Sequence, residues 1–382
     1  MTRADDEQLF LFAGGGTGGH IYPALAIAEE LKARLGARAR FHFICSSRAI
    51  DRSILSAEGV AFTPAPAQPL SLRPLGLLRF LRGWAPSIRL ARGIIREAGA
   101  PGANERGGAP ASVHVVAMGG FVAAPVVQAA RVERCPVLLV NLDAVPGKAN
   151  RWIARRAAAA VTACPVDAPY ARAWKSVGPI VRSAARAAVP QAQARSELGL
   201  DPDRPVLMIT GGSQGAGSIN DFMAAFVRSD ADVLRGWQVL HQAGHDHHPA
   251  LTDHYAQAGV RAIVTPFVRT MGLWWSAADV AISRAGAGSV AEAWAAGVPT
   301  LFLPYPHHRD QHQRRNADVL VRAEAAVVHV DHLDPSANLA DAGEGLRRLL
   351  RDPARRAAMR AAAANLGPPD GARLTSQILT SL

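Results

Sequence analysis

Cysteine, long apolar runs and acidic residues are all scarce in this chain of 382 residues. The three cysteines, Cys45, Cys135 and Cys164, are far apart and form no CxxC pair, so we expect neither a disulfide framework nor a cysteine zinc site. No apolar run reaches the roughly 18 residues that span a bilayer. The acidic, polar start at residues 1–8 is unlike a secretory signal. We therefore expect a cytoplasmic protein whose contact with a membrane is peripheral.

The 31 acidic residues are outnumbered by 42 Lys and Arg, which leaves a formal net charge of +11. Such an excess favours polyanionic partners: nucleic acid, anionic lipid or phosphorylated substrates. Most of the basic residues are arginine, which suits phosphate contacts but which a GC-rich genome also enriches. The hydrophobic share of 49% is typical of a globular protein and argues against extended disorder.

Strand and helix patterns alternate along the chain, and each half opens with a strand, a glycine loop and a helix. Apolar runs predict buried strands at residues 9–13, 41–45, 113–117, 136–140, 206–210, 239–241, 262–264, 280–282 and 300–303. The repetition predicts an α/β protein of two Rossmann-like, doubly wound parallel-sheet domains that face each other across a ligand cleft. We place the N-terminal domain at residues 1–182 and the C-terminal domain at residues 183–382, with a last helix that could return to the N-terminal domain.

The first loop, residues 14–20, contains five glycines, which let a backbone adopt positive φ and approach a ligand closely. The N-terminus of the following helix would offer free N–H groups to a phosphate. The spacing is neither GxGxxG nor a P-loop, since no GK[ST] follows, so nicotinamide binding and NTP hydrolysis are disfavoured. The alternative is a tight turn that binds no ligand.

Three further segments follow strands. Residues 211–216 repeat the glycine pattern, and Ser213 could add a hydroxyl to the donors around a phosphate. Residues 118–121 (MGGF) form either part of the same site or a simple turn. Ser289 and Glu292 could form a capping box, but we favour a role in which the Glu292 carboxylate accepts from both hydroxyls of a ribose. Beyond the next strand, Asp310 and Gln313 suit sugar hydroxyls.

Five segments together resemble the inverting, two-domain nucleotide-sugar glycosyltransferases of the GT-B type, and most of all the MurG-type N-acetylglucosaminyltransferases. They are GGGTGGH at 14–20, MGGF at 118–121, GGSQGA at 211–216, RAGAGSVAE at 284–292 and PYPHHRDQHQRRNA at 304–317. The resemblance implies transfer of N-acetylglucosamine from UDP-N-acetylglucosamine to undecaprenyl-pyrophosphoryl-N-acetylmuramyl pentapeptide in peptidoglycan synthesis. It also implies action at the cytoplasmic face of the membrane, with no cofactor and no metal.

The resemblance further implies a set of substrate-binding residues. Residues 17–19 would lie near the diphosphate, Arg182 and Ser213 would bind the donor phosphates, residues 287–291 would wrap the nucleotide, and Gln313 would face the sugar hydroxyls. Valine 268 would meet uracil through its backbone. The full set is Thr17, Gly18, Gly19, Arg182, Ser213, Val268, Ala287, Gly288, Ser289, Val290, Ala291, Glu292 and Gln313.

Inversion at the anomeric carbon needs a base for the acceptor hydroxyl and stabilisation of the leaving diphosphate. His20 is the candidate base, because histidine titrates near neutrality; the alternative is a histidine that only braces the loop. Asp143 is a rival base. A helix N-terminus and Arg182 could neutralise the departing phosphates without a metal.

The chain departs from the family pattern where the acceptor and the phosphates are expected. Residues 140–143 (VNLD) replace the usual HEQN, so Asp143 stands where the family has Asn. Residues 178–182 (GPIVR) lack the Asn of GNPVR, and Arg269 stands where an acidic residue is common. These changes leave open a related transferase with a different lipid acceptor. A UDP-N-acetylglucosamine epimerase and a catalytically silent nucleotide-sugar-binding protein are further alternatives.

The segment at residues 68–96 contains no acidic residue, and its six arginines are interleaved with large apolar side chains. This composition is typical of an interfacial segment, so we expect it to bind an anionic membrane surface. The alternative is a buried helix with solvated arginines. We do not expect nucleic acid as a partner, because the apolar side chains are mainly aliphatic and offer few stacking faces.

Overall fold

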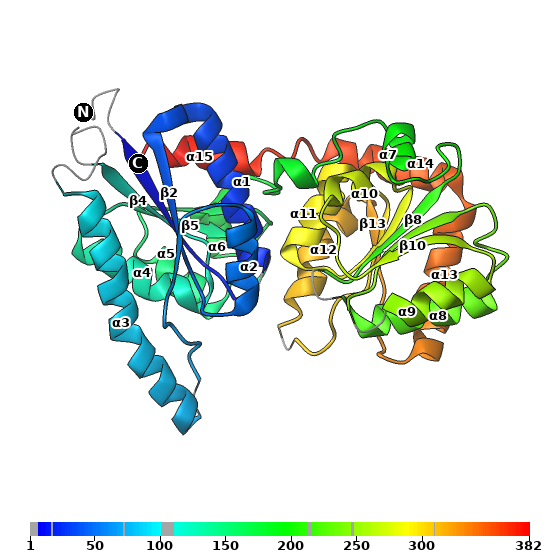
Figure 1. Ribbon diagram of the computed structural model, residues 1–382, viewed down its shortest axis with the longest axis horizontal. Coiled ribbons are helices and arrows are strands. Elements are labelled where there is room, and N and C mark those ends of the chain that lie inside the picture. The colour runs from blue at the N-terminus through cyan, green and yellow to red at the C-terminus, as the bar shows by residue number, and fades with distance from the viewer. Residues whose placement is uncertain are drawn as a thin grey trace. The chain divides into compact units, whose positions relative to one another are not determined.

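The computed structural model describes residues 7–16, 18–71, 73–100, 111–212, 215–245, 248–308 and 310–382. The chain forms two compact units, Met1–Ile180 together with Asp370–Leu382, and Val181–Pro369. The C-terminal helix α15 (Gly371–Leu379) belongs to the first unit, where it packs against α1 (Gly18–Leu35), as Figure 1 shows. At its start, the Gly371 N–H donates to Pro179 O at 3.1 Å.

The first unit is built on a seven-stranded parallel sheet in the order β3-β2-β1-β4-β5-β6-β7. Its strands are β1 (Gln8–Ala13), β2 (Ala39–Cys45), β3 (Phe62–Pro64), β4 (Ser112–Ala117), β5 (Val137–Asn141), β6 (Ala159–Thr162) and β7 (Lys175–Ser176). Besides α1 and α15, its helices are α2 (Ala49–Ala57), α3 (Pro74–Ala98), α4 (Gly120–Val132), α5 (Lys148–Ala154) and α6 (Tyr170–Ala173).

The centre of this sheet is apolar on both faces, as expected when helices cover both sides of a parallel sheet. In β1, Phe10 and Leu11 are 0% exposed although they point to opposite faces. Helix α1 buries Leu25, Ala28 and Leu31, which recur at helical spacing. The burial pattern therefore follows from the two periodicities in the sequence.

The second unit is built on a six-stranded parallel sheet in the order β10-β9-β8-β11-β12-β13. Its strands are β8 (Val206–Thr210), β9 (Gln238–Gln242), β10 (Arg261–Thr265), β11 (Val280–Ser283), β12 (Thr300–Phe302) and β13 (Ala326–Val328). Its helices are α7 (Gln191–Glu197), α8 (Gly217–Ser229), α9 (His248–Gln257), α10 (Met271–Ala277), α11 (Ala287–Ala296), α12 (His312–Arg322), α13 (Pro335–Arg351) and α14 (Pro353–Asn365).

The predicted fold class of two parallel-sheet α/β domains is confirmed, and every predicted strand is present. Strands β3, β6, β7 and β13 are not evident from the sequence. They contain only two to four residues and lie at or next to the sheet edges, where too few side chains are buried to form a recognisable apolar run.

Among the residues that the structure describes, no helix combines the length and the apolar character needed to cross a membrane.

Candidate active site

In each sheet, successive strands are added on one side of the first strand and then on its other side. The glycine-rich loops of the sequence follow the two strands at this point of reversal. In the first unit β1 lies between β2 and β4, and residues 14–20 and 118–121 follow β1 and β4. In the second unit β8 lies between β9 and β11, and residues 211–216 and 284–287 follow β8 and β11. Open α/β sheets bind ligands at such switch points, outside the carboxyl ends of the strands. Each unit thus presents its loops where a ligand is expected.

The first loop approaches a buried carboxylate. Its backbone has φ of +154° at Gly15 and +94° at Gly16, values that L side chains rarely adopt. A Cβ on Gly15 would lie 2.5 Å from Asp51 Oδ2. The Gly16 N–H donates to the same Oδ2 at 2.7 Å, and the Arg48 guanidinium donates to Gly16 O at 2.6 Å. The first turn of α2 and its N-cap residue, Arg48, therefore hold the loop in place.

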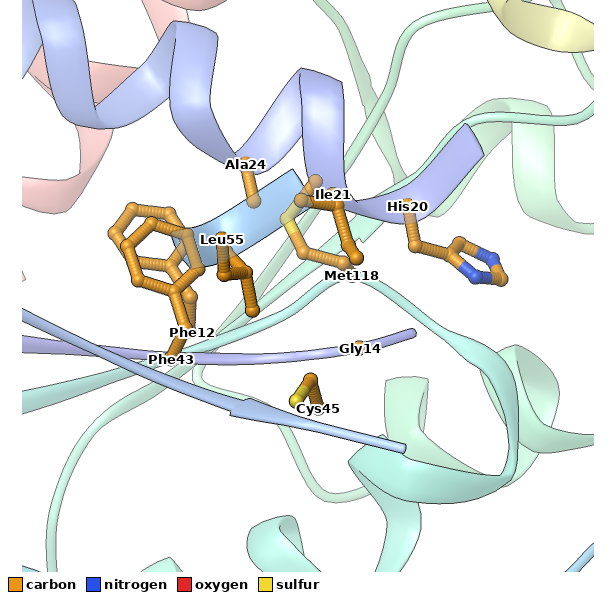
Figure 2. Close-up of a pocket in the computed structure, with 9 residues that line it drawn as sticks. All are labelled: Phe12, Gly14, His20, Ile21, Ala24, Phe43, Cys45, Leu55 and Met118. Atoms are coloured by element: carbon orange, nitrogen blue, oxygen red, sulfur yellow. The ribbon is translucent and has the colours of Figure 1, made fainter. Parts of the chain in front are cut away.

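The half-buried His20 lies in the first turn of α1, and its Nδ1 is 3.2 Å from Gly15 O. A carbonyl oxygen only accepts, so Nδ1 is the protonated nitrogen in this bond. In the neutral ring, Nε2 then carries the lone pair that a general base needs. Figure 2 shows the ring turned away from the apolar side chains beneath the loop.

The pocket in Figure 2 lies between these apolar side chains and is lined mainly by residues such as Phe12, Phe43 and Leu55, with His20 at one end. The cavity has a volume of about 10 Å³, which is enough for one water molecule. A nucleotide sugar does not fit there. This cavity is therefore too small to be a nucleotide-sugar site.

The loop after β4 packs against His20. A Cβ on Gly120 would lie 3.3 Å from His20 Cε1, and a Cβ on Gly119 would lie 2.6 Å from Asn150 Oδ1. These glycines leave space for the imidazole ring and for the asparagine. The MGGF segment is therefore a close contact of the candidate base as well as a turn.

The rival base, Asp143, lies on a loop that a buried amide network holds. Asn141 is 0% exposed, and its Nδ2 donates to Asp143 O at 2.7 Å and to Thr162 Oγ1 at 3.0 Å. Its Oδ1 accepts from Asn150 Nδ2 at 2.9 Å. Since Asn150 also contacts Gly119, the network connects the loops after β4 and β5, and the sequence alone did not indicate it.

In the second unit, the alternative of a capping box formed by Ser289 and Glu292, which we did not favour, is wrong. Helix α11 begins at Ala287 with Gly286 as the N-cap, so Ser289 is the third residue of the helix rather than its cap. Within the described part of the chain, no side chain caps this helix. Its first N–H groups can therefore bind an anion, as the role predicted for residues 287–291 requires.

Glu292 binds the indole of a buried tryptophan instead of the helix N-terminus. Its Oε2 accepts from Trp275 Nε1 at 3.0 Å, and Trp275 on α10 is 1% exposed. Burial raises the pKa of Glu292 to about 7, and the bond from Trp275 acts in the opposite direction. An acid held by one oxygen and titrating near neutrality is typical of a ligand-binding site.

In the polar segment after β12, the two residues predicted to bind sugar hydroxyls, Gln313 and Asp310, have different hydrogen-bond partners. Gln313 Oε1 accepts from the Tyr305 N–H at 2.9 Å, so its amide N–H₂ is the end that can donate to a sugar. Asp310 instead accepts from His312 Nδ1 at 2.8 Å, and this bond lowers the pKa of Asp310. His312 therefore occupies one oxygen, Oδ1, of a carboxylate that we expected to suit sugar hydroxyls.

A buried ion pair, not expected from the sequence, fixes the loops around this segment. Arg284 donates to Asp331 Oδ2 at 2.6 Å, to Leu303 O at 2.8 Å and to Ser218 Oγ at 2.8 Å. The side chain of Asp331 is 0% exposed. The contacts join the ends of β11 and β12 to the first turn of α8.

The remaining predicted ligands are placed as follows. Val268 is 7% exposed, so its side chain offers little surface to a nucleobase, and the backbone contact with uracil stays a prediction. Arg182 is half-buried and directly precedes a 3₁₀ turn at Ser183–Ala185, and both lie in the second unit. Gly18 is buried and Gly19 is exposed. Thr17 and Ser213 lie outside the described residues.

Helix α3, which carries most of the basic apolar segment at residues 68–96, is exposed over its N-terminal half. Figure 1 shows this half extending beyond the other helices of the first unit. Leu75 is 72% and Leu81 is 59% exposed, whereas Ala91 and Ile95 bury the C-terminal half. The alternative of a buried helix with solvated arginines therefore does not describe the N-terminal half of α3.

The arginines of residues 68–96 fall into two groups. Arg92 and Arg96 bind Glu133 Oε1 at 2.6 and 3.0 Å. The exposed ones that bind no carboxylate within the described residues are Arg73, Arg79, Arg82 and Arg89.

Comparison with known proteins decides the family. The N-terminal domain of glycosyltransferase family 28 matches residues 10–162, and the C-terminal domain of the same family matches residues 206–374. The chain belongs to glycosyltransferase family 28. The two matches include the switch-point loops after β1, β4, β8 and β11.

Curated relatives of this family 28 chain match it over nearly their whole length. A protein of Clavibacter michiganensis subsp. michiganensis is 36% identical, covering 95% of this chain and 94% of its own. One of Azotobacter vinelandii is 33% identical, covering 96% and 97%. Both are named UDP-N-acetylglucosamine--N-acetylmuramyl-(pentapeptide) pyrophosphoryl-undecaprenol N-acetylglucosamine transferase.

Among solved structures, Acinetobacter baumannii MurG is similar to this family 28 chain with a TM-score of 0.70 and 24% sequence identity. The similarity covers 99% of this chain and 100% of that one. It confirms the fold, two parallel-sheet α/β units of the glycosyltransferase type.

Proposed function

We propose that this family 28 glycosyltransferase transfers N-acetylglucosamine, with inversion, from UDP-N-acetylglucosamine to undecaprenyl-pyrophosphoryl-N-acetylmuramyl pentapeptide. The observation that carries the proposal is the 36% identity, over 95% of the chain, to a relative named for this reaction. The positions of His20 and Glu292 at the switch points of their sheets support it. The protein would then act in peptidoglycan synthesis, at the cytoplasmic face of the membrane.

The chemistry is a single displacement at the anomeric carbon. The acceptor hydroxyl oxygen attacks this carbon, and the bond from the carbon to the UDP oxygen breaks, so UDP leaves with the electron pair. His20 Nε2 takes the hydroxyl proton, because the bond from Nδ1 to Gly15 O sets the ring tautomer that this step needs. Proton removal and bond cleavage are thereby assisted by different groups.

The donor is bound by the second unit. The N–H groups at the start of α11, together with Arg182, stabilise the diphosphate as its charge develops. Glu292 accepts from the ribose hydroxyls, and the Val268 backbone meets the uracil. The Gln313 amide donates to the sugar, because Tyr305 already occupies its oxygen.

An acceptor-dependence assay tests the proposal. Purified protein is incubated with UDP-N-acetylglucosamine, with and without the lipid-linked muramyl pentapeptide, and both UDP and product are followed. We expect UDP release that requires the acceptor and equals product in amount. Conversion of the donor without acceptor would instead identify an epimerase, and silence in every condition would identify a binding protein.

A different lipid acceptor is the second candidate, and Asp143 favours it. The family Asn is replaced by a carboxylate here, on a loop that Asn141 holds in place. The same assay with lipid-linked acceptors of other sugars decides between the two. Faster turnover with one of these than with the muramyl pentapeptide would support the second candidate.

We further propose that the exposed half of α3 binds an anionic membrane surface. Exposed Leu75, Leu78 and Leu81 lie among exposed arginines on this half. Each arginine near an anionic surface contributes about 1 kcal/mol, and apolar area removed from water contributes ~25 cal/mol per Å². The two contributions together suffice for reversible, peripheral binding.

Replacing Leu75 and Leu81 together by Asp should lower binding to anionic vesicles tenfold or more, because each change removes apolar burial and adds a repelled charge. Vesicle sedimentation measures the bound fraction. The matched control replaces Val132 and Leu333, which are 49% and 44% exposed, by Asp. Equal loss in both double variants would show a net-charge effect and contradict a specific surface on α3.

A further inference from the structure

Asp51 is a buried carboxylate next to the candidate base, and the proposed function so far gives it no part. It lies in the first turn of α2 and is 0% exposed. Its Oδ2 accepts from Gly16 N at 2.7 Å, from Ser46 N at 3.0 Å and from Ser46 Oγ at 2.6 Å. Its Oδ1 is buried too, and within the described residues it has no hydrogen-bond partner. A carboxylate buried in this manner is unfavourable for stability, so packing alone does not account for it.

The hydrogen bonds of Asp51 and His20 meet on one peptide group. The carbonyl of Gly15 and the N–H of Gly16 are the two polar ends of the peptide that joins these residues. The N–H donates to Asp51 Oδ2, while the carbonyl oxygen accepts from His20 Nδ1 at 3.2 Å. The order in space is therefore carboxylate, peptide group, imidazole.

Hydrogen bonds that share a peptide group in this manner polarise one another. The carboxylate attracts the Gly16 hydrogen, electron density moves toward Gly15 O, and this oxygen holds the Nδ1 proton of His20 more firmly. In Ser-His-Asp enzymes a carboxylate bound directly to Nδ1 fixes the ring tautomer and stabilises the imidazolium. Here a peptide group would transmit the same influence over a longer distance.

We infer that Asp51 is a positioning residue for the base, and that it acts on His20 through the Gly15–Gly16 peptide group. The inference rests on the proposed function, in which His20 Nε2 takes the acceptor proton. No proton moves to Asp51: the acceptor hydroxyl loses its proton, Nε2 gains it, and the carboxylate stabilises the charge on the ring.

Arg48 supplies the matched control. Its guanidinium donates at 2.6 Å to Gly16 O, which belongs to the next peptide group along the chain. Loss of either side chain removes a charge-assisted bond to the same loop. Only Asp51, however, binds the same peptide group as His20. A general loosening of the loop would therefore alter both variants, whereas loss of the influence through the peptide group would alter only the Asp51 variant.

The first test compares Asp51→Asn with Arg48→Met in kcat, in KM for the donor and in pH dependence. Asp51→Asn should lower kcat about 10- to 100-fold and leave the donor KM within about threefold. The acid side of its kcat profile should move to lower pH, because the ring loses a stabilising negative charge. Arg48→Met should keep the wild-type pH profile. The same displacement in both variants, or in neither, would overturn the inference.

The second test does not need turnover. The ring signals of His20, assigned by their loss in His20→Gln, are followed by NMR against pH in the wild type and in each variant. Asp51→Asn should displace the titration midpoint to lower pH, and Arg48→Met should not. Identical midpoints would overturn the inference in an active enzyme. A wild type without acceptor-dependent UDP release would overturn the proposed function and leave this comparison intact.

Ser46→Ala provides a milder variant in case Asp51→Asn does not fold. The Ser46 hydroxyl donates to Asp51 Oδ2 and so offsets part of its charge. Without this hydroxyl, more of the negative charge acts on the peptide group, and the His20 midpoint should move to higher pH. An unchanged midpoint, or one displaced to lower pH, would count against the pathway.

Discussion

His20→Ala is expected to lower kcat by about 10²- to 10⁴-fold, the range that general-base catalysis commonly contributes. The donor KM should stay within about threefold, because the diphosphate and ribose contacts proposed above come from α11 and Glu292. The His20 ring, by contrast, binds Gly15 O and lies next to Gly120. Steady-state kinetics with varied donor, at saturating acceptor, separates the two parameters.

His20→Gln distinguishes proton transfer from bracing of the loop. The glutamine amide can donate to Gly15 O as Nδ1 does now, but it is not a base at neutral pH. Equal losses in His20→Gln and His20→Ala would support the base. Near-normal turnover of His20→Gln, combined with a large loss in Asp143→Asn, would transfer the role of base to Asp143.

The fold could be read from the sequence wherever burial is complete. Residues 206–209 form an unbroken apolar run, because β8 is central and helices cover both faces of its sheet. β7, by contrast, consists of two exposed residues, Lys175 and Ser176, at a sheet edge. It is a strand only because it pairs with β6, and no local sequence pattern predicts this pairing.

Candidate site residues could be proposed from the sequence where they are close together along the chain, as in the glycine loops and His20, and their roles stay predictions. The side chains that support them could not, because they come from distant parts of the chain. Asp51 is 35 residues from Gly16, and Trp275 is 17 residues from Glu292. The capping-box alternative for Ser289 and Glu292 is wrong for a related reason. A Ser-x-x-Glu pattern does not define where a helix begins, and here the helix already begins at Ala287.

Glu292→Gln should weaken binding of UDP-N-acetylglucosamine about 10- to 100-fold, with a smaller effect on kcat. Hydrogen bonds to a charged group contribute about 1.5–3 kcal/mol, and the neutral amide loses most of this advantage toward two ribose hydroxyls. Calorimetric titration with UDP and with 2′-deoxy-UDP checks the assignment. The wild type should prefer UDP, and Glu292→Gln should lose much of this preference; an unchanged ratio would remove Glu292 from the ribose.

The pKa of Glu292 is raised to about 7, so a rise in pH should increase donor affinity but decrease the stability of the fold. The ionised form accepts the hydroxyls, so donor affinity of the wild type should rise from pH 6 to pH 8, whereas that of Glu292→Gln stays level. The folded protein binds more protons than the unfolded chain between the ordinary carboxyl pKa and about 7, so its unfolding free energy falls as pH rises through this window. Relative to wild type, Glu292→Gln should therefore gain about 1–3 kcal/mol of stability at pH 8 and little at pH 4.

Trp275→Phe connects these two effects to one hydrogen bond. The indole N–H donates to Glu292 Oε2 and lowers its pKa, so its removal should raise the pKa of Glu292 further and displace the rise in donor affinity to higher pH. Adding Trp275→Phe to Glu292→Gln should then change donor affinity little, since the carboxylate it orients is gone. Additive losses in the double variant would mean that Trp275 acts on the donor independently of Glu292.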